Sequence, residues 1–298
     1  PDDEFKRLGA TSLFAAFTPE DGTAPLGFQV VVTPVFPQSK FLVSAQSIPE
    51  NTLVKEAVSP AVTVGNVETA LKVMVNGNGW DGSLIAFRGW SHFPEYEVAD
   101  VSTVTSSTAP GGKITYVIVR PSYHRTRVLG GDFAINSGKW TMRAESAFTW
   151  TENGDGANVL IEPPHWDTVI GVERPLGEDF RIQVQGLWRY HTKYVAIDSA
   201  SWGNPATDAI NRGVAKTNAL LVGYQDRSRP GMTTRFTYTN EDLGLETELF
   251  LMGNFTGGDY LIRPKLAYAM TDALKTTVGV DQYGGPSDRQ MGAMKTYN

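Results

Sequence analysis

The chain has 298 residues and a net charge of −6, and it contains no cysteine. The acidic balance argues against a nucleic-acid-binding protein, whose usual signature is a basic face and a high pI. The absence of cysteine excludes disulfides and thiolate metal sites, and no apolar run reaches the ~18 residues of a membrane helix.

Most periodic segments of the chain alternate with period two, which predicts β-strands, because successive strand side chains point to opposite faces. The predicted strands cover residues 27–36, 68–77, 80–91, 125–136, 139–150, 166–174, 180–193, 218–227, 232–240, 245–254, 259–270 and 273–283. Helical periodicity is rare, and short segments such as "TDAINRGVAKTNALL", residues 207–221, are compatible with a helix within a loop.

The connections between the predicted strands are of two kinds. "NGNG" at 76–79, "NSGK" at 136–139 and "PLGED" at 175–179 predict tight hairpin turns. Longer polar connections are predicted at 37–67, 92–124, 151–165 and 194–217. Short turns that alternate with long loops are typical of transmembrane β-barrels. The alternation fails after about Gln225, which indicates that one strand there is miscounted.

One strand raises the question of which sheet face meets water. In "RIQVQGLWRYH", residues 181–191, one face carries Ile182, Val184, Gly186, Trp188 and Tyr190, and the other is polar and largely cationic. A soluble sheet turns its apolar face inward, whereas a membrane barrel turns it to lipid and lines its lumen with the polar face.

Pairs of tryptophans favour lipid on the apolar face. Trp80 and Trp90, like Trp140 and Trp150, are ten residues apart, so each pair shares a face and is separated by about one membrane thickness in a tilted strand. Tryptophan prefers the membrane–water interface. Arg88 shares the face of the first pair and must extend to the interface. The predicted lipid-interface aromatics are Trp80, Trp90, Trp140, Trp150, Trp188 and Tyr190.

The opposite strand faces carry charges of both signs near their centres. The predicted pore-lining residues are Arg143, Glu145, Asp167, Glu173, Arg181, Gln183, Gln185, Arg189, Glu246, Glu248, Arg263, Lys265, Lys275 and Asp281. A soluble antiparallel domain shows the same alternation and stays as an alternative. Pro264 lies mid-strand and removes a ladder donor, so a bulge or break is expected there.

The sequence carries no recognisable catalytic motif. His92, His124, His165 and His191 are scattered, without the spacing of a zinc site, and no G-x-S-x-G nucleophile elbow occurs. We therefore expect no enzyme, no cofactor and no metal site.

Five segments together resemble a known family. "VVVTPVFPQSKF", "ETALKVMVNGNGWDGSLIAFRGWSHFPEY", "RTRVLGGDFAINSGKWTMRAESAFTWT", "HWDTVIGVERPLGEDFRIQVQGLWRY" and "DYLIRPKLAYAMTDALKTTVGVDQYGGPSD" occur in this order. They resemble uncharacterised, porin-like Gram-negative outer-membrane β-barrel proteins, which are distantly similar to alginate-export and phosphate-selective porins. The resemblance implies an all-β antiparallel transmembrane barrel in the bacterial outer membrane.

About a dozen strands are visible, and we expect 14–18 in the complete protein. Residues 1–298 then form a single barrel domain, which we expect to be incomplete at both ends, because the chain lacks an initial Met and stops at "MKTYN" without a terminal aromatic strand. The loop at 37–67 is expected to form a constriction or an extracellular loop.

Three functions are compatible with these features of the sequence. The first is a passive channel for small solutes or ions, with outer-membrane lipid around it. The second is a plugged or narrow barrel that serves as a scaffold for a partner such as a periplasmic cytochrome, an export complex or a surface assembly. The third is a soluble β-rich binding protein or carbohydrate-active enzyme. No nucleic-acid partner is expected.

Overall fold

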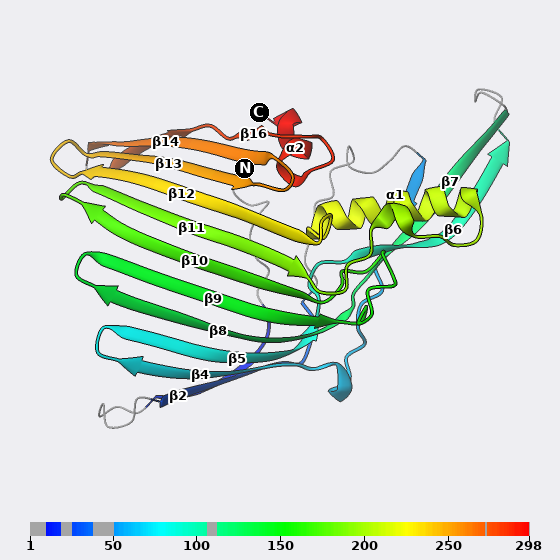
Figure 1. Ribbon diagram of the computed structural model, residues 1–298, viewed down its shortest axis with the longest axis horizontal. Coiled ribbons are helices and arrows are strands. Elements are labelled where there is room, and N and C mark those ends of the chain that lie inside the picture. Colours follow the sequence, from blue (N-terminus) through cyan, green and yellow to red (C-terminus); the bar gives the residue numbers. More distant parts are fainter. Residues whose placement is uncertain (1–9, 19–25, 38–50, 106–111, 272, 298) are drawn as a thin grey trace.

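The computed structural model describes residues 10–18, 26–37, 51–105, 112–271 and 273–297. A large antiparallel sheet dominates it, with strand order β1-β2-β4-β5-β8-β9-β10-β11-β12-β13-β14-β15 and β16 beside β14 (Figure 1). The strands are β1 (Leu13–Phe17), β2 (Leu26–Thr33), β4 (Glu68–Gly77), β5 (Trp80–Trp90), β8 (Arg125–Ser137), β9 (Trp140–Thr151), β10 (His165–Leu176), β11 (Phe180–His191), β12 (Ser228–Asn240), β13 (Leu245–Asn254), β14 (Asp259–Thr271), β15 (Leu274–Gly279) and β16 (Gln282–Gly284).

The predicted all-β antiparallel fold of about a dozen strands is therefore confirmed. β1 and β15 form the two edges of the sheet, and no ladder joins these edges within the described ranges. β1 was not predicted from the sequence. Closure of the sheet into a barrel stays a prediction.

The three predicted tight turns join β4 to β5, β8 to β9 and β10 to β11. In each turn one glycine has a positive φ, 78° at Gly79, 60° at Gly138 and 79° at Gly177, which a residue with a side chain rarely adopts. All three turns lie at one end of the sheet, which we call the turn end. The opposite end carries the long connections and is called the loop end (Figure 1).

A second, smaller sheet lies at the loop end. The stretch 92–124, predicted as a loop, contains the hairpin of β6 (Glu95–Thr105) and β7 (Lys113–Ser122), and β3 (Thr52–Val54) pairs in parallel with β7. The loop prediction was wrong here because Val, Thr and Tyr recur through the stretch, and these residues favour strands.

The predicted loop 37–67 is described only in part. Residues 38–50 lie outside the described residues. Of the remainder, Thr52–Val54 forms β3 in the small sheet, and Val64–Asn66 forms the 3₁₀ helix η2. The expectation that this loop forms a constriction stays a prediction.

The strand predicted at 218–227 is wrong, because residues up to 222 belong to the helix α1 (Pro205–Val222). The Asn204 side chain accepts a hydrogen bond from the Thr207 amide at 2.9 Å, and Pro205 occupies the first turn. Both features are typical helix starts. Gly223 ends the helix with a left-handed φ of 101°. The helix buries Asn211, Ala215, Asn218 and Ala219, which lie on one helical stripe.

Removing that false strand restores the alternation of turns. The 192–227 connection becomes another long excursion at the loop end, and the β12–β13 and β14–β15 connections fall at the turn end with the other tight turns. The β13–β14 connection, between Asn254 and Asp259, is a short one at the loop end.

The break expected at Pro264 falls in the neighbouring strand. β14 runs unbroken through Pro264, but its partner is split into β15, which ends at Gly279, and β16, which begins at Gln282. The Val280 amide donates a hydrogen bond to the Pro264 carbonyl at 3.2 Å. In an antiparallel ladder the residue at position 264 would donate a second hydrogen bond back to residue 280, but proline has no N–H. The ladder therefore lacks one hydrogen bond at this point.

The cluster of buried apolar residues lies under α1, whereas Leu261 and Ala267 of β14 are the buried apolar residues on the described part of the large sheet. Val159, Ile197, Ala215, Ala219 and Tyr224 form a buried cluster between α1 and the loops. The remaining helices are short: η4 (Ile197–Ser199), α2 (Gln290–Ala293) and η5 (Met294–Tyr297). None of the helices that the structure describes has both the length and the apolar character needed to cross a bilayer.

Candidate functional site

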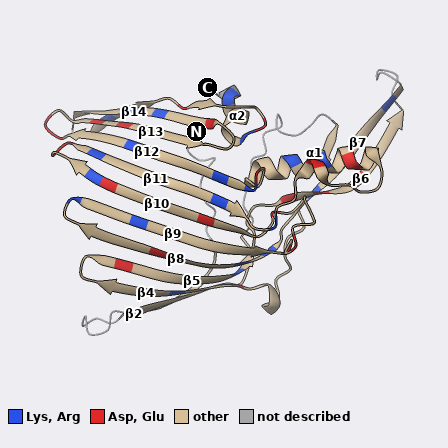
Figure 2. Cartoon of the chain, viewed as in Figure 1, with Lys and Arg blue, Asp and Glu red and all other residues tan. Residues whose placement is uncertain are grey.

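Thirteen of the fourteen predicted pore-lining residues lie on one face of the large sheet, which we call the polar face. Cross-strand partners share a face, and the ladder registers connect these thirteen positions from β9 to β15. The fourteenth, Asp281, lies between β15 and β16 and pairs with Arg263 of this face. Figure 2 shows charges of both signs along the strands as well as at their ends.

Ion pairs between strands cross the polar face. Glu173 lies between two arginines, 3.7 Å from Arg143 and 3.4 Å from Arg181. Further pairs join Arg189 to Asp167 at 2.6 Å, Arg235 to Glu248 at 3.6 Å, Lys275 to Glu246 at 2.7 Å, and Arg263 to Asp281 at 2.5 Å.

Gln185 accepts a hydrogen bond from Thr233, and Gln183 lies opposite both Glu173 and Arg235. Glu145 lies opposite Asp132, and Lys265 opposite Glu248.

The opposite face of the sheet, which we call the apolar face, is open to the surroundings. Leu84, Leu129 and Ile170 near strand centres are 66%, 53% and 60% exposed. The charged residues on this face of the described strands all lie near strand ends, and they are Arg88, Arg125, Arg127 and Arg174. The apolar face therefore has an uncharged central band.

Aromatic side chains border that band at both ends. The six predicted interface aromatics all lie on the apolar face, with Trp80 and Trp140 at the turn end and Trp90, Trp150, Trp188 and Tyr190 at the loop end. Trp166, which was not predicted as an interface aromatic, joins the loop-end row. Its ring lies 5.0 Å from Phe148, which in turn contacts Trp150 at 4.6 Å.

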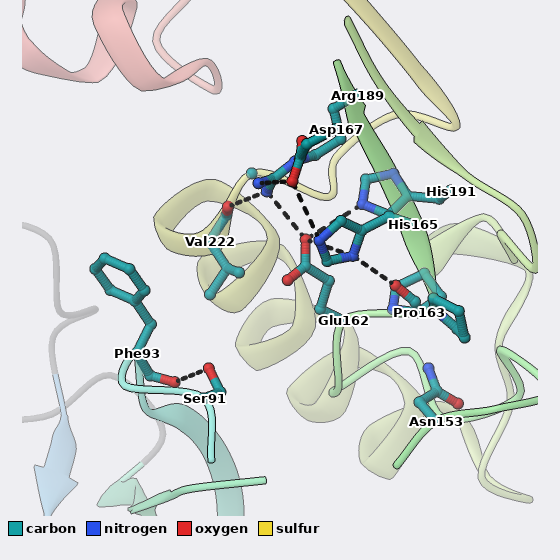
Figure 3. Close-up of polar contacts among 12 residues, drawn as sticks. Ser91, Phe93, Asn153, Glu162, Pro163, His165, Asp167, Arg189, His191 and Val222 are labelled. Atoms are coloured by element: carbon teal, nitrogen blue, oxygen red, sulfur yellow. Dashed lines mark hydrogen bonds and ion pairs between the residues drawn. The ribbon is translucent and has the colours of Figure 1, made fainter. Parts of the chain in front are cut away.

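A cluster of ionisable residues lies on the polar face at the loop end, where β10 begins and β11 ends (Figure 3). His165 and His191 are direct cross-strand partners. Glu162 Oε1 lies 3.3 Å from His191 Nε2, 3.6 Å from His165 Nδ1 and 3.1 Å from Arg189 Nη1. Arg189 also binds Asp167 through Nε and Nη2, at 2.6 and 2.9 Å.

The charges of this cluster are paired with one another or face polar atoms. Both ring nitrogens of His165 face oxygen acceptors, because Nδ1 lies 3.1 Å from the Pro163 carbonyl and Nε2 lies 3.4 Å from Asp167 Oδ2. Burial alone would raise the pKa of Glu162. The hydrogen bond from His191 and the positive charges of His165 and Arg189 outweigh burial and hold that pKa below its usual value. Glu162 is therefore a buried carboxylate with paired charge.

A cavity of about 170 Å³ adjoins the cluster, and we call it the loop-end pocket. Its lining is polar except for one isoleucine, and consists of Ser91, Glu95, His124, Thr126, Thr149, Thr151, Ile161, Glu162 and His165. Glu95 is buried and accepts a hydrogen bond from the Glu162 amide at 2.5 Å. Burial and the nearby charges of Glu162, Glu97 and Glu152 raise the pKa of Glu95 well above its usual value, against the lowering effect of that hydrogen bond.

Three residues of the cluster have metal-type donor atoms close together. One donor atom each from Glu162, His165 and His191 lies within 4.8 Å of the others. The positive Arg189 guanidinium is 3.1 Å from the Glu162 oxygen that this trio would offer. His165 Nδ1 lies 3.1 Å from the Pro163 carbonyl. These contacts describe an ion-paired network, and the trio does not fit a cation.

The four histidines are scattered along the sequence, but the fold gathers them at the loop end. His92 lies 3.1 Å from Glu68, and His124 lies 3.1 Å from Glu152. One signal was present in the sequence, because the predicted turn at 175–179 aligns residue 165 almost opposite residue 191. His124 and Glu95 come from a connection that was predicted as a loop, and no sequence spacing links them to residue 162.

Comparison with models of protein families finds no match, and a search of curated proteins finds no similar sequence.

Proposed function

We propose that this chain is an outer-membrane β-barrel that passes small solutes or ions through a lumen lined by the polar face. The observation that carries the proposal is the apolar face, with its exposed, uncharged central band between two aromatic rows. A soluble monomer rarely exposes a contiguous apolar patch larger than a few hundred Å². In a bilayer the same band faces lipid, and the aromatic rows lie at the two interfaces.

The strand lengths agree with this environment. β4, β5 and β8 to β14 are 10 to 13 residues long, and a tilted strand needs ~9–11 residues to cross the hydrocarbon core. The resemblance of five segments to porin-like outer-membrane proteins supports the same conclusion. A barrel also requires the edges at β1 and β15 to be paired, directly or through further strands, since unpaired backbone groups are costly in lipid.

The lumen of this barrel carries both charge signs, so its selectivity depends on which charges are accessible. Arg143 and Arg181 share Glu173, and their side chains are 57% and 64% exposed. Arg189 is held by Asp167 and Glu162 and is 29% exposed. Rings of charge set the ion preference of a pore. Arg143 and Arg181 are therefore the cationic side chains we assign to selectivity.

The first test is whether the chain is a membrane barrel. The purified chain is mixed with detergent micelles or lipid vesicles and run on a gel with and without boiling. A folded barrel resists unfolding by the gel detergent and migrates differently before heating. A chain that stays folded and monodisperse in plain buffer, with no heat-dependent shift, would instead support a soluble β-rich protein.

The second test measures the pore. In planar bilayers, the double variant Arg143→Gln/Arg181→Gln is expected to shift the reversal potential towards cation preference, because the accessible positive charge is lost and Glu173 remains. Lys216→Gln is the control, because Lys216 lies on α1, pairs with Asp198 and is 59% exposed. An unchanged reversal potential and conductance in the double variant would mean that these arginines do not line the pore.

A scaffold is the second candidate function, and the extensions at the loop end favour it. α1 packs beside β6, and both lie beyond the strands of the large sheet (Figure 1). Such extensions offer a surface to a partner protein. Solute flux in liposomes separates the two functions, because an open channel leaks small solutes and a plugged scaffold does not.

A further inference from the structure

Two polar atoms at the loop-end pocket are buried without a hydrogen-bond partner in the described structure, His124 Nε2 and Thr151 Oγ1. The His124 side chain is 10% exposed. Its Nε2 has two carboxylate oxygens nearby, Glu95 Oε2 at 3.8 Å and Glu97 Oε1 at 3.9 Å. Both distances are too long for a hydrogen bond. Leaving such a nitrogen without a partner costs free energy, so a ligand that satisfies it would be favoured.

A hydrogen bond from the other ring nitrogen of His124 sets the orientation of the imidazole. Nδ1 lies 3.1 Å from Glu152 Oε2 and donates its proton there. Metal-binding histidines commonly donate their second N–H to a carboxylate, which sets the tautomer and leaves the other nitrogen as a lone-pair donor. His124 has this arrangement, with Nε2 as the open nitrogen.

Glu95 supplies a carboxyl oxygen beside that nitrogen, and a bound cation would displace any proton that burial keeps on it. Its Oε1 accepts the Glu162 amide, and its Oε2 is the oxygen 3.8 Å from His124 Nε2. Nitrogen and oxygen ligands lie about 2.0–2.2 Å from zinc, so two of them are separated by roughly 3.3 Å in a tetrahedral site. A small inward movement of these two side chains would reach that separation.

Glu162 also lines the pocket, but its charge is already paired. Arg189 and His191 both contact its Oε1, whereas Oε2 is turned away from these partners in Figure 3. The Arg189 charge is thereby satisfied by Glu162 and Asp167. Glu95 has no Lys or Arg ion pair in the described residues, and a buried carboxylate without a cation is costly.

We propose that the loop-end pocket binds one divalent transition-metal ion of the zinc type, with His124 Nε2 and Glu95 Oε2 as its two protein ligands and water completing the coordination shell. Imidazole and carboxylate donors together suit this class of ion. The pocket volume of about 170 Å³ leaves room for the ion and a few waters, each of which fills ~30 Å³ in the liquid. Glu152 is a positioning residue that orients His124.

The test is a titration of the full chain with Zn²⁺ alone, after chelator treatment, in the micelles or buffer in which the chain folds. Competition with a chromogenic chelator gives the affinity, and one Zn²⁺ per chain is expected. His124→Gln and Glu95→Gln should each weaken binding roughly 100-fold, and Glu152→Gln about tenfold. Glu95→Gln retains an acceptor for the Glu162 amide, so it is the variant that best preserves the fold.

His92→Gln is the matched control, because His92 forms a histidine–glutamate pair with Glu68 at the same end of the sheet and does not line the pocket. It should bind Zn²⁺ like the parent. The proposal is overturned if the parent binds no Zn²⁺, or if Glu95→Gln and His124→Gln bind it as the parent does. Should His124→Gln not fold, X-ray absorption of the zinc-loaded parent decides, since a first shell without histidine nitrogen overturns the proposal.

The outcome of the zinc titration is separate from that of the channel experiments. The titration needs only a folded chain, and the channel measurements need only the polar face of the large sheet. If the chain binds Zn²⁺ but conducts no ions, the metal-site proposal stands and the channel proposal fails. If it conducts ions but binds no Zn²⁺, the channel proposal stands and the metal-site proposal fails.

Discussion

His165 and His191 face each other across the β10–β11 ladder with ring centroids 5.5 Å apart, and both rings contact one oxygen of Glu162. Arg189 contacts the same oxygen at 3.1 Å. One carboxylate thus holds three cationic or proton-bearing side chains where the large sheet meets its long connections. We therefore expect the Glu162 carboxylate to stabilise the packing of the loop end.

We expect Glu162→Gln to lower the free energy of unfolding by about 3 kcal/mol, because removing one partner of a buried charge cluster leaves the others uncompensated. Arg189 retains Asp167, which keeps the loss at the lower end of the range for buried pairs. Denaturant titration in lipid vesicles measures the change.

Glu173→Gln is the control for that change. Glu173 also contacts two arginines, but both arginines are more than half exposed, so its loss should cost less than about 1 kcal/mol. Equal losses in the two variants would contradict the structural role of Glu162.

Asn218 links α1 to the small sheet and to the connection before β10. Its buried amide accepts from the Tyr96 N–H and donates to the carbonyls of Tyr96 and Leu160, each at 2.9 Å. Asn218→Ala leaves these buried backbone groups without a partner, at ~1–3 kcal/mol each. We expect a total loss of about 3 kcal/mol in the free energy of unfolding.

The neighbouring Thr217→Ala is the control, because Thr217 is only partly buried and its hydroxyl donates within its own helix, to the Gly213 carbonyl. It should change the stability by less than about 0.5 kcal/mol. Hydrogen exchange in α1 gives a second measurement, and faster exchange in both variants alike would argue against the proposed link.

The two-faced sheet could be predicted from sequence because alternation is a local property. The opposite faces of Ile182 and Arg181 follow from their adjacent positions in one strand, whatever the partner strand is. Gly138 and Gly177 indicate tight turns because glycine readily adopts the positive φ that such turns need. The predicted pore-lining residues of the described strands therefore share one side of the large sheet and the predicted interface aromatics share the other, whereas the assignment of these sides to a lumen and to lipid stays a prediction.

The loop-end pocket could not be predicted, because its residues meet only through tertiary packing. Glu95 comes from a hairpin that was predicted as a loop, His124 precedes β8, and Glu162 precedes β10. The error at 218–227 has a related cause. Asn218 looks like a strand start by local alternation, whereas its buried contacts with Tyr96 and Leu160 exist only once α1 packs on β6.

We expect the contribution of Tyr224 to the free energy of unfolding to fall at alkaline pH. Burial, followed by the charges of Glu95 and Glu162, raises the pKa of Tyr224 well above its usual value of about 10. The unfolded chain therefore ionises this tyrosine first. Its contribution to stability is complete below pH ~10 and is lost as the pH rises towards the pKa of the folded state.

Tyr224→Phe removes the hydrogen bond from the tyrosine hydroxyl to the Val159 carbonyl, which is 3.3 Å long, and should cost about 1 kcal/mol at neutral pH. Above pH ~10 the parent loses stability faster than the variant, so the difference should shrink and then reverse. The measurement is the free energy of unfolding of both proteins across the alkaline range, and a constant difference would contradict the assignment.

The orientation of the sheet can be tested at two adjacent residues of β10. Ile170 lies on the apolar face near the strand centre and is 60% exposed, and Val169 lies on the polar face opposite Glu145. In a bilayer, Ile170→Arg should cost ~2–4 kcal/mol, because the charge lies near the membrane midplane. Val169→Arg faces the lumen and a carboxylate, so it should cost less than about 1 kcal/mol.

A soluble sheet predicts a different result for the same pair. An arginine at an exposed position in water changes stability by less than about 0.5 kcal/mol, so Ile170→Arg would then be nearly neutral. Refolding yield and denaturant titration in vesicles measure both variants against the parent. A neutral Ile170→Arg, or a larger loss for Val169→Arg than for Ile170→Arg, would mean that lipid does not face the apolar side, and the channel proposal would fail with it.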